Sequence, residues 1–440
     1  MTRVSSQRSS GAWKGNLCKS VGTALLALSA ATAAGATDWP QPGMNAAHTG
    51  YNAKEQTLST GNVGSLSKSW DKATQLQITT PPVLSGKRVF ALSTDGTLYA
   101  RNAISGKLLW TFLADKNGTP NYWGVAVGND IVYVNCQIDY DDTEYLGHGG
   151  LCALDAKTGK ELWTYAIYTE GGMSVDSAPY DAPVIDGQNV IFGISDSASF
   201  AHVGYVVTLD AKTGDLVAGV GNCSDTLFND CNYVSSAPPA ALGGELFYQG
   251  GAADGPQGSQ GAVCARVETA TSVDWCYYNV DTNLALTVEK GLVLFAEGTS
   301  SSTSNLVALS LSNGAVVWST AVGSGQNNTH FAPAVANGVA YFSVGLGQNA
   351  LYAVSLKKGK VLWSYTTGSA GYLTSGVSVA NGVVYAVCGA NSGSQCAFDA
   401  ATGAVLRNDT SGGSSLATPL VANGAEISVC NSNDLCRFTP

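Results

Sequence analysis

The sequence contains few charged residues, and lysine and arginine are the scarcest. Only 12% of its 440 residues are charged, and 22 Lys and Arg stand against 32 Asp and Glu, giving a formal net charge of −10. A chain this acidic has no basic patch that would attract nucleic acid or an anionic lipid surface. We therefore expect no nucleic-acid partner.

Long apolar runs and helical periodicity are also missing beyond the first 36 residues. No later segment approaches the roughly 18 uninterrupted apolar residues that a membrane-spanning helix requires. None shows a sustained 3.6-residue apolar period with capping residues. Glycine, in contrast, supplies 52 residues, which suits many turns and closely packed strands. The composition favours an all-β protein without a transmembrane segment.

The first 36 residues are typical of an export signal. Four basic residues precede or enter a stretch of small apolar residues, Val21 to Ala34, and Ala34-Gly35-Ala36 offers an A-x-A cleavage site. Cleavage near Ala36 would leave a mature chain that begins near Thr37. Its formal charge would be −14, from 18 Lys and Arg (22 less the four in the leader) against 32 acids. We expect export to the periplasm or the medium, between which the sequence does not distinguish.

Ten of the 11 cysteines lie outside this leader, and they fall into neighbouring pairs that predict local disulfides. Most pairs bracket a predicted hairpin, where facing Cβ atoms of adjacent strands approach the separation that a disulfide requires. Other connectivities stay open. Metal binding is the rival interpretation, but the chain has no Cys-x-x-Cys and only four histidines. The expected pairs are Cys136/Cys152, Cys223/Cys231, Cys264/Cys276, Cys388/Cys396 and Cys430/Cys436.

A turn motif recurs seven times, and its clearest copy runs from Leu154 to Trp163. Each copy joins two apolar runs through a polar turn with a glycine, which tryptophan usually follows four residues later. The turn positions are Gly106, Gly159, Gly214, Thr271, Gly314, Gly359 and Gly403, followed by Trp110, Trp163, Ala218, Trp275, Trp318, Trp363 and Arg407. A repeat of short strands at this spacing is typical of radial β architecture.

Each repeat predicts four strands, and the last repeat is one strand short. The eight units begin near Thr79, Trp123, Ala182, Ala237, Asn283, Phe331, Ser375 and Ala417. The eighth ends at Phe438, whereas Val63 to Trp70 resembles the fourth strands of the other units. Pairing this segment with the last unit would close the ring and leave no open sheet edge. We predict one eight-bladed β-propeller of four-stranded antiparallel blades over residues 63–440, with residues 37–62 along its rim or base. A linear solenoid would leave the last unit uncapped.

The repeated residues have structural explanations. An aspartate before the turn can accept hydrogen bonds from turn N–H groups, and the glycine adopts a conformation that is costly for other residues. The tryptophan can lie against the neighbouring blade and bury about 150–250 Å² of aromatic surface. We therefore assign blade docking, rather than catalysis, to Trp70, Trp110, Trp163, Trp275, Trp318 and Trp363.

The A-x-D-x-x-T-G-x-x-x-W pattern resembles the tryptophan-docking motif of the pyrroloquinoline quinone (PQQ) repeat family. That family includes quinoprotein alcohol dehydrogenases and non-enzymatic propellers such as the outer-membrane assembly lipoprotein. The resemblance covers nearly all of residues 38–440. The segment containing Asp38-Trp39, Gly43-Met44, Tyr51 and Asn62-Val63 is similar to the N-terminal signature of quinoproteins.

The chain departs from the enzymes of this family in ways that bear on cofactors. It has no adjacent cysteine pair, no Cys-x-x-Cys-His haem site, and no segment that matches the family's calcium ligands. PQQ carries several carboxylates and needs cationic partners. Arginine is scarce, at Arg3, Arg8, Arg88, Arg101, Arg266, Arg407 and Arg437. We expect no cofactor; PQQ and Ca²⁺ belong to the alternative that the resemblance implies.

Candidate ligand contacts come from the loops that lead into each blade. In a propeller of this strand order, these loops share a face with those between the second and third strands. Several are rich in Gly, Ser, Asn and Asp, which suits polar ligands and ordinary solvated turns alike. Our candidates are Tyr168, Asp176 and Tyr180 in the longest such loop, and His330 in another.

No metal or catalytic motif stands out. Asp139, Asp141 and Glu144 could offer alternating oxygen ligands to calcium, but the segment lacks the glycine and flanking helices of the helix–loop–helix calcium site. An acidic hairpin tip is the favoured interpretation. The chain contains no nucleophile elbow, phosphate loop or zinc-protease motif, so we assign no catalytic residue.

The leading hypothesis is an exported, disulfide-braced, monomeric propeller that acts as a non-catalytic binding or scaffold module for a protein or a carbohydrate-like ligand. The first alternative is a soluble PQQ- and calcium-dependent quinoprotein that oxidises alcohols or sugars. The second is an assembly factor of the bacterial envelope.

Overall fold

The structure is a computed structural model, and it describes residues 37–115, 124–141, 146–166, 182–195, 204–220, 233–234, 238–252, 260–270, 272–280, 285–298, 303–324, 331–344, 349–366, 373, 375–388, 394–409 and 417–440. The chain divides into two compact units, Met1–Gly35 and Ala36–Pro440, and all described residues belong to the second.

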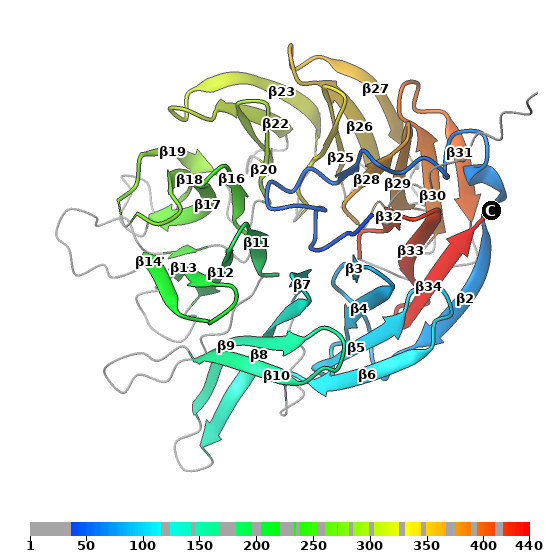
Figure 1. The fold of residues 1–440 in the computed structure, drawn as a ribbon. Helices are drawn as coiled ribbons and strands as arrows, with labels where there is room; N and C mark the ends of the chain where they lie inside the picture. Colours follow the sequence, from blue (N-terminus) through cyan, green and yellow to red (C-terminus); the bar gives the residue numbers. More distant parts are fainter. Residues whose placement is uncertain are drawn as a thin grey trace, which may run out of the picture. The chain divides into compact units, whose positions relative to one another are not determined.

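The second unit consists of eight antiparallel sheets arranged around a ring (Figure 1). Blade 1 contains β3 (Val83–Ser85), β4 (Arg88–Leu92), β5 (Thr97–Asn102) and β6 (Leu108–Leu113). Blade 2 contains β7 (Val125–Gly128), β8 (Ile131–Asp141), β9 (Leu146–Asp155) and β10 (Glu161–Ala166). Blade 3 contains β11 (Val184–Asp186), β12 (Asn189–Ser195), β13 (Gly204–Asp210) and β14 (Leu216–Val220). Blade 4 contains β16 (Ala240–Leu242), β17 (Glu245–Ala252), β18 (Gln260–Val267) and β19 (Trp275–Val280), and β15 (Tyr233–Val234) also pairs with β17.

The remaining blades follow the same order. Blade 5 contains β20 (Thr287–Glu289), β21 (Leu292–Gly298), β22 (Thr303–Ser310) and β23 (Val316–Ser324). Blade 6 contains β24 (Ala334–Ala336), β25 (Val339–Val344), β26 (Ala350–Ser355) and β27 (Val361–Thr366). Blade 7 contains β28 (Ser378–Ala380), β29 (Val383–Cys388), β30 (Ser394–Asp399) and β31 (Val405–Asp409). Blade 8 contains β32 (Leu420–Ala422), β33 (Ala425–Cys430) and β34 (Asp434–Thr439). The prediction of an all-β, eight-bladed propeller is confirmed.

The fourth strand of blade 8 comes from the N-terminal region, as predicted. Strand β2 (Ser67–Ala73) pairs antiparallel with β34, and Trp70 stands opposite Arg437. The preceding residues form a short 3₁₀ helix, η1 (Val63–Ser65). No helix in the described part of the chain has the length and apolarity needed to cross a bilayer.

Apolar clusters between neighbouring blades form the core. One cluster joins Phe90 of blade 1 to Val134 of blade 2, and another joins Ile427 of blade 8 to Val89 of blade 1. Comparable clusters occupy the other six junctions. Alternating side chains of the inner strands face these clusters, so these strands are buried on both sides, whereas outermost strands such as β6 and β27 are largely exposed. The cluster between the last and first blades closes the ring.

The ring has two distinct ends. We call the end where strands one and two, and strands three and four, are joined the hairpin end. We call the end where consecutive blades are connected the loop end. A β-bulge near the hairpin end of most blades shifts the register at the motif tryptophan, as between Ala100/Trp110 and Arg101/Leu108 in blade 1.

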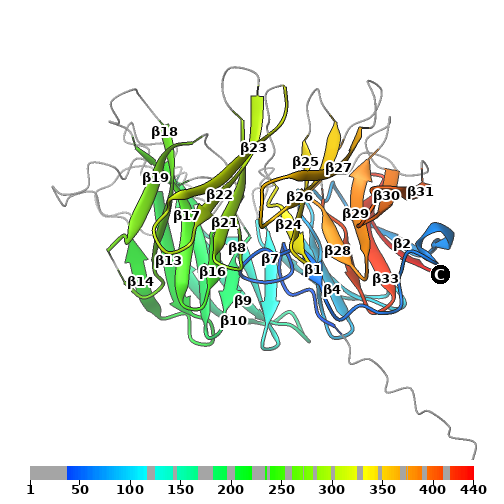
Figure 2. The same cartoon turned by 90° about the horizontal axis from the view of Figure 1, so that it is seen from above.

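Residues 37–55, the lap segment, make one circuit of the ring near its hairpin end (Figures 1 and 2). Trp39 exchanges backbone hydrogen bonds with Leu84, the middle residue of β3. The later contacts reach the equivalent residue of each innermost strand in turn: Pro40 with Val127, Gln41 with Ile185, Ala46 with Ala241, Ala47 with Val288, Thr49 with Val335, Gly50 with Val379 and Asn52 with Val421. Strand β1 (Tyr51–Asn52) lies parallel to β28 within this circuit.

Candidate functional site

The four candidate ligand residues, Tyr168, Asp176, Tyr180 and His330, lie outside the described residues, so their role stays a prediction. Of the weak calcium candidates, Asp139 and Asp141 belong to β8, where they pair in register with His148 and Leu146. Their side chains, and Glu144 as a whole, lie outside the described part.

The repeated tryptophans dock each blade onto the next through their indole N–H groups. Trp110 of blade 1 donates to the carbonyl of Ala156 in the turn of blade 2, at 3.2 Å. Four more follow the same rule: Trp70 to Ala103, Trp275 to Leu311, Trp318 to Leu356 and Trp363 to Ala400. Trp163 is the exception: its indole N–H has no partner among the described residues, and Tyr133 donates to the equivalent carbonyl, that of Ala211, at 2.7 Å.

The aspartate of the motif holds its turn together. In blade 2, Asp155 Oδ1 accepts hydrogen bonds from the backbone N–H groups of Lys157 and Thr158 and from the Thr158 hydroxyl. These hydrogen bonds hold the pKa of Asp155 below its ordinary value, and the one from the Thr158 hydroxyl has the largest effect. The tryptophans and aspartates of the motif are thus engaged in the fold and are not free for chemistry.

At the junction of blades 3 and 4, where Ala218 stands in place of tryptophan, an arginine makes the docking contact. Arg266 has no exposed surface. Its Nη1 donates to the carbonyls of Glu268 and Ala270 in the turn of blade 4, and Nη2 reaches the carbonyl of Val206 in blade 3. A guanidinium here supplies several donors to turn carbonyls, where an indole supplies one.

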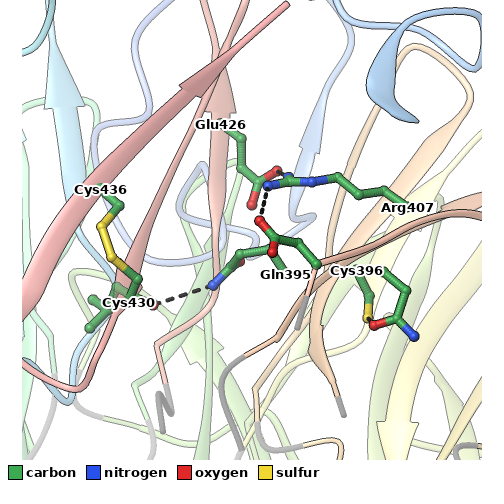
Figure 3. Close-up of polar contacts among 9 residues, drawn as sticks. Gln395, Cys396, Arg407, Glu426, Cys430 and Cys436 are labelled. Carbon is green, nitrogen blue, oxygen red and sulfur yellow. Dashed lines mark hydrogen bonds and ion pairs between the residues drawn. A yellow bond between two sulfur atoms is a disulfide. The ribbon is translucent and has the colours of Figure 1, made fainter. Parts of the chain in front are cut away.

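At the junction of blades 7 and 8, the docking contact is a buried ion pair (Figure 3). Arg407 Nη1 lies 2.6 Å from Glu426 Oε2, and the two side chains are 5% and 2% exposed. The guanidinium also lies 4.6 Å from the ring centre of Phe438 and 3.4 Å from Asp409 Oδ2. We call this arrangement the polar seam.

Burial sets the electrostatics of the polar seam. It raises the pKa of Glu426, and the nearby Arg407 opposes that shift. Burial also raises the pKa of Tyr385, with added contributions from Glu426 and Glu55. A tyrosine with a raised pKa stays protonated and cannot serve as a base at neutral pH. The buried ion pair thus joins blade 7 to blade 8 at the position where most other junctions use a tryptophan.

Cysteines of two disulfides lie near the polar seam, and Figure 3 shows the Cys430–Cys436 bond and Cys396 of the other. Cys388–Cys396 joins β29 to β30 in blade 7, and Cys430–Cys436 joins β33 to β34 in blade 8. Between them, Gln395 Nε2 donates across the junction to the carbonyl of Val429, at 3.3 Å. The structure also contains Cys136–Cys152 and Cys264–Cys276, whereas Cys223 and Cys231 lie outside the described residues.

The lap segment makes buried structural contacts that the sequence did not reveal. His48 is 3% exposed, and its Nδ1 lies 3.0 Å from the carbonyl of Leu286. A carbonyl only accepts, so Nδ1 carries the proton and donates. Burial lowers the pKa of His48 to about 4, which keeps the imidazole neutral. No sequence motif identifies this role, because the lap segment has neither strand nor helix periodicity.

The arginines beyond the leader are engaged within the blades or lie at the hairpin end. All five arginines beyond the leader lie in the described residues. Four donate to groups within the fold: Arg101 to the carbonyls of Gly106 and Ala73, Arg266 to turn carbonyls, Arg407 to Glu426, and Arg437 to Ser69 Oγ. The fifth, Arg88, begins β4 next to a hairpin turn. None is placed at the loop end to bind the carboxylates of PQQ.

The lysines and the metal-ligand candidates lead to the same result. Apart from Lys116, which lies outside the described residues, the lysines beyond the leader occur in hairpin-end turns, in β2, or at Lys54. Within the described part of the chain, no cluster of three or more His, Cys, Asp or Glu side chains could hold a metal ion. The described residues thus form neither a cationic cluster at the loop end nor a metal site, and most connecting segments of that end lie outside them.

Comparison with known families identifies one that spans the propeller. The family model described as outer membrane protein assembly factor BamB matches residues 67–249 and 251–437. These ranges include every blade.

Curated relatives match over a shorter stretch. The chain is 27% identical over 194 residues to quinohemoprotein alcohol dehydrogenase of Comamonas testosteroni, a match that covers 42% of this chain and 26% of that protein. It is 30% identical over 191 residues to the dehydrogenase subunit of alcohol dehydrogenase (quinone) of Gluconobacter oxydans, covering 41% and 24%. The chain thus matches about a quarter of the length of these relatives.

Solved structures resemble the propeller over most of its length. Quinohemoprotein alcohol dehydrogenase ADHIIG of Pseudomonas putida aligns with a TM-score of 0.70 at 14% identity, covering 92% of this chain and 80% of that one. BamB of Moraxella catarrhalis aligns with a TM-score of 0.58 at 15% identity, covering 86% and 98%. At such identities the likeness concerns the fold alone.

Proposed function

The chain belongs to the propeller family described as outer membrane protein assembly factor BamB, and from this premise we propose that it is an exported, non-catalytic binding module for a partner protein. The engagement of its arginines carries the proposal. Each of the five beyond the leader is used within the blades or lies at the hairpin end. A quinone enzyme needs such side chains at its cofactor.

The arrangement of the two ends supports a binding role for the loop end. The lap segment covers the innermost strands near the hairpin end, whereas the polar connecting segments begin and end at the loop end. Rigid blades that present polar loops are a common basis for recognition. A carbohydrate-like ligand is the other outcome that the binding test below can return.

Export is part of the proposal. The apolar leader with its A-G-A site and the paired cysteines suit a periplasmic or secreted protein. The four disulfides of the described residues are consistent with an oxidising compartment. We propose that the mature chain acts as a monomer, which light scattering after size exclusion would check.

The test of the binding role begins with protein purified from the exported fraction of its own cells. Cross-linking followed by mass spectrometry should identify one partner with links to segments at the loop end. That partner, purified separately, should bind the mature protein in calorimetry. Links confined to the hairpin end, or binding only to glycans in an array, would contradict the assignment of a protein partner.

The runner-up is a PQQ- and calcium-dependent alcohol or sugar dehydrogenase, which the names of the relatives favour. Purified mature protein with PQQ and Ca²⁺ should show neither a change in quinone absorbance nor reduction of an artificial dye with a panel of alcohols and sugars. A quinoprotein alcohol dehydrogenase assayed in parallel is the positive control. Dye reduction by this chain would replace the first proposal with the second.

The family description makes an envelope assembly factor a specific form of the leading proposal. In that case the partner found by cross-linking would be an outer-membrane assembly component. A partner unrelated to the envelope would exclude this form and retain the binding role.

A further inference from the structure

A single side chain, that of Asn423, holds the first described residue on both sides of its backbone. Thr37 N lies 2.7 Å from Asn423 Oδ1, and Asn423 Nδ2 donates to the carbonyl of Thr37 at 3.0 Å. Thr37 is only 6% exposed, although it stands next to the boundary of the compact unit. The side chain of Asn423 therefore fixes both the position and the direction of the chain at residue 37.

The two ends of the lap segment meet at the same turn. Asn423 and Gly424 form the hairpin between β32 and β33, with φ values of 55° and 68°. Gly424 donates its N–H to Glu55 Oε2 at 3.0 Å, directly beside the residue that binds Thr37. The segment thus starts and finishes its circuit of the ring at blade 8.

This turn also lies beside a buried carboxyl group that has no cationic partner among the described residues. Glu55 is 4% exposed, and its carboxylate accepts backbone hydrogen bonds from Thr57, Leu58 and Gly424. No Lys or Arg in the described ranges forms an ion pair with it. A buried carboxylate gains stability from a nearby positive charge. An α-ammonium on Thr37 would provide one at the adjacent residue of the turn.

We infer that the Ala36–Thr37 peptide bond is a proteolytic processing site, and that the Asn423-Gly424 turn with Glu55 binds the α-ammonium that cleavage creates. The inference rests on the proposed export, which would bring the chain to a signal peptidase. Hydrolysis breaks the C–N bond; water supplies the hydroxyl group to the Ala36 carbonyl carbon and a proton to the Thr37 nitrogen. That amine takes a further proton at neutral pH. A peptide N–H then becomes a charged donor, whose hydrogen bonds are roughly twice as strong.

The first experiment determines the N-terminus of protein exported from a full-length gene by Edman sequencing and intact mass. Thr37 is expected, and a start at any other residue would overturn the inference. The second compares the mature protein beginning at Thr37 with the same chain preceded by Ala-Gly-Ala. Amide hydrogen exchange in residues 39–52 should be about tenfold faster in the extended chain. Equal exchange rates would overturn the inference.

A matched pair of variants isolates the role of Asn423. Asn423→Gly removes the amide and keeps a residue suited to the positive φ. It should speed exchange in the chain beginning at Thr37 and have a smaller effect in the extended chain. Asn337→Gly is the control, because Asn337 occupies the same kind of turn in blade 6, with a φ of 52° and an exposed side chain. If Asn423→Gly acts equally on both chains, Asn423 recognises only peptide groups and the inference fails. These readouts need no partner, so they are independent of the outcome of the binding test.

Discussion

The indole of Trp110 in blade 1 lies over Gly159 in blade 2, so close that a Cβ atom on Gly159 would stand 2.7 Å from Cδ2 and Cε3 of the ring. The same relationship joins five further blade pairs: Trp70 to Gly106, Trp163 to Gly214, Trp275 to Gly314, Trp318 to Gly359 and Trp363 to Gly403. The two junctions without a tryptophan also lack the glycine. At the junction of blades 3 and 4, Ala218 stands in place of the tryptophan and Thr271 in place of the glycine. At the junction of blades 7 and 8, Arg407 stands in place of the tryptophan, and no turn connects the third and fourth strands of blade 8. The tryptophan of one blade and the turn glycine of the next thus occur together, as the two sides of one packing contact.

The first prediction concerns the glycine of this pair. Gly159→Ala should destabilise the protein by two independent effects. A left-handed backbone conformation, here with a φ of 70°, costs alanine about 1–2 kcal/mol. The clash with Trp110 adds about 1–3 kcal/mol of overpacking. Urea unfolding would measure the sum.

Gly187→Ala supplies the control for Gly159→Ala. Gly187 also has a positive φ, of 59°, but no atom would lie within 4 Å of its added Cβ. It should show only the conformational cost. Equal losses for the two variants would mean that the indole moves aside and that close docking is not required.

The second prediction concerns the polar seam. Arg407→Met should cost about 3–5 kcal/mol, because it leaves the carboxylate of Glu426 buried without its partner. The double variant Arg407→Met/Glu426→Leu removes both charges and should recover most of this loss. Unfolding of both variants in guanidinium chloride would measure these differences in the free energy of unfolding. A double variant as unstable as the single one would show that the ion pair itself, and not the orphaned charge, determines the stability of this junction.

The third prediction is a pH dependence that arises from His48. Burial lowers its folded-state pKa to about 4, from an ordinary value of 6.5. Between these two values the unfolded chain binds a proton that the folded protein does not, so the free energy of unfolding falls as the pH falls. The loss begins near pH 6.5 and reaches about 3 kcal/mol once the pH is below the folded pKa. Thermal unfolding from pH 7.5 to pH 4 would measure it.

His48→Asn tests whether His48 is the source of this pH dependence. Asparagine tolerates the φ of 54° at this position, and its amide can donate to the carbonyl of Leu286 in place of Nδ1. The variant should keep the hydrogen bond and lose most of the stability change between pH 6.5 and pH 4. An unchanged pH profile would assign the effect to the carboxylates instead.

The ring could be predicted from the sequence because the motif that indicates a blade is repeated along the chain. Seven blades repeat the polar turn, six of these turns have the glycine and five are followed by the tryptophan, and the missing last strand could be matched to the segment around Trp70. The disulfides were predictable for a similar reason, since pairs such as Cys388 and Cys396 bracket a hairpin. Repetition supplies several copies of each local signal, so one irregular copy does not obscure the pattern.

A position at the rim or base was predicted for residues 37–62, but the individual contacts of the lap segment and the polar seam were not, because each occurs once. Gln41 and Asn52 contact the innermost strands through side-chain amides, where most other residues of the lap segment use backbone groups. Neither residue belongs to a repeated motif. The seam had a weak signal, namely Arg407 in place of tryptophan. Its partner, Glu426, lies in a strand whose only other polar residue is Ser428, and the contact between Arg407 and Glu426 depends on the packing of one blade against the next.

The last prediction tests the lap segment at its contact with blade 3. Gln41 is 2% exposed and uses its side-chain amide as a backbone strand would: Oε1 accepts from Ile185 N–H at 2.6 Å, and Nε2 donates to Ile185 O at 3.3 Å. In Gln41→Glu the acceptor remains, but a carboxylate oxygen replaces the donor and faces a carbonyl. The ionised form of this variant should have a free energy of unfolding about 1–3 kcal/mol lower than that of the parent.

Protonation restores a donor to the Gln41→Glu side chain, so its deficit relative to the parent should shrink as the pH falls from 7 to 5. Gln41→Met is the matched control, since it removes both hydrogen bonds at similar volume and should show the same deficit at both pH values. Each variant is compared with the parent at the same pH, which cancels the contribution of His48. A Gln41→Glu deficit that stays constant across this range would mean that water has entered the contact, and that the lap segment is held to blade 3 by its neighbours and not by this amide.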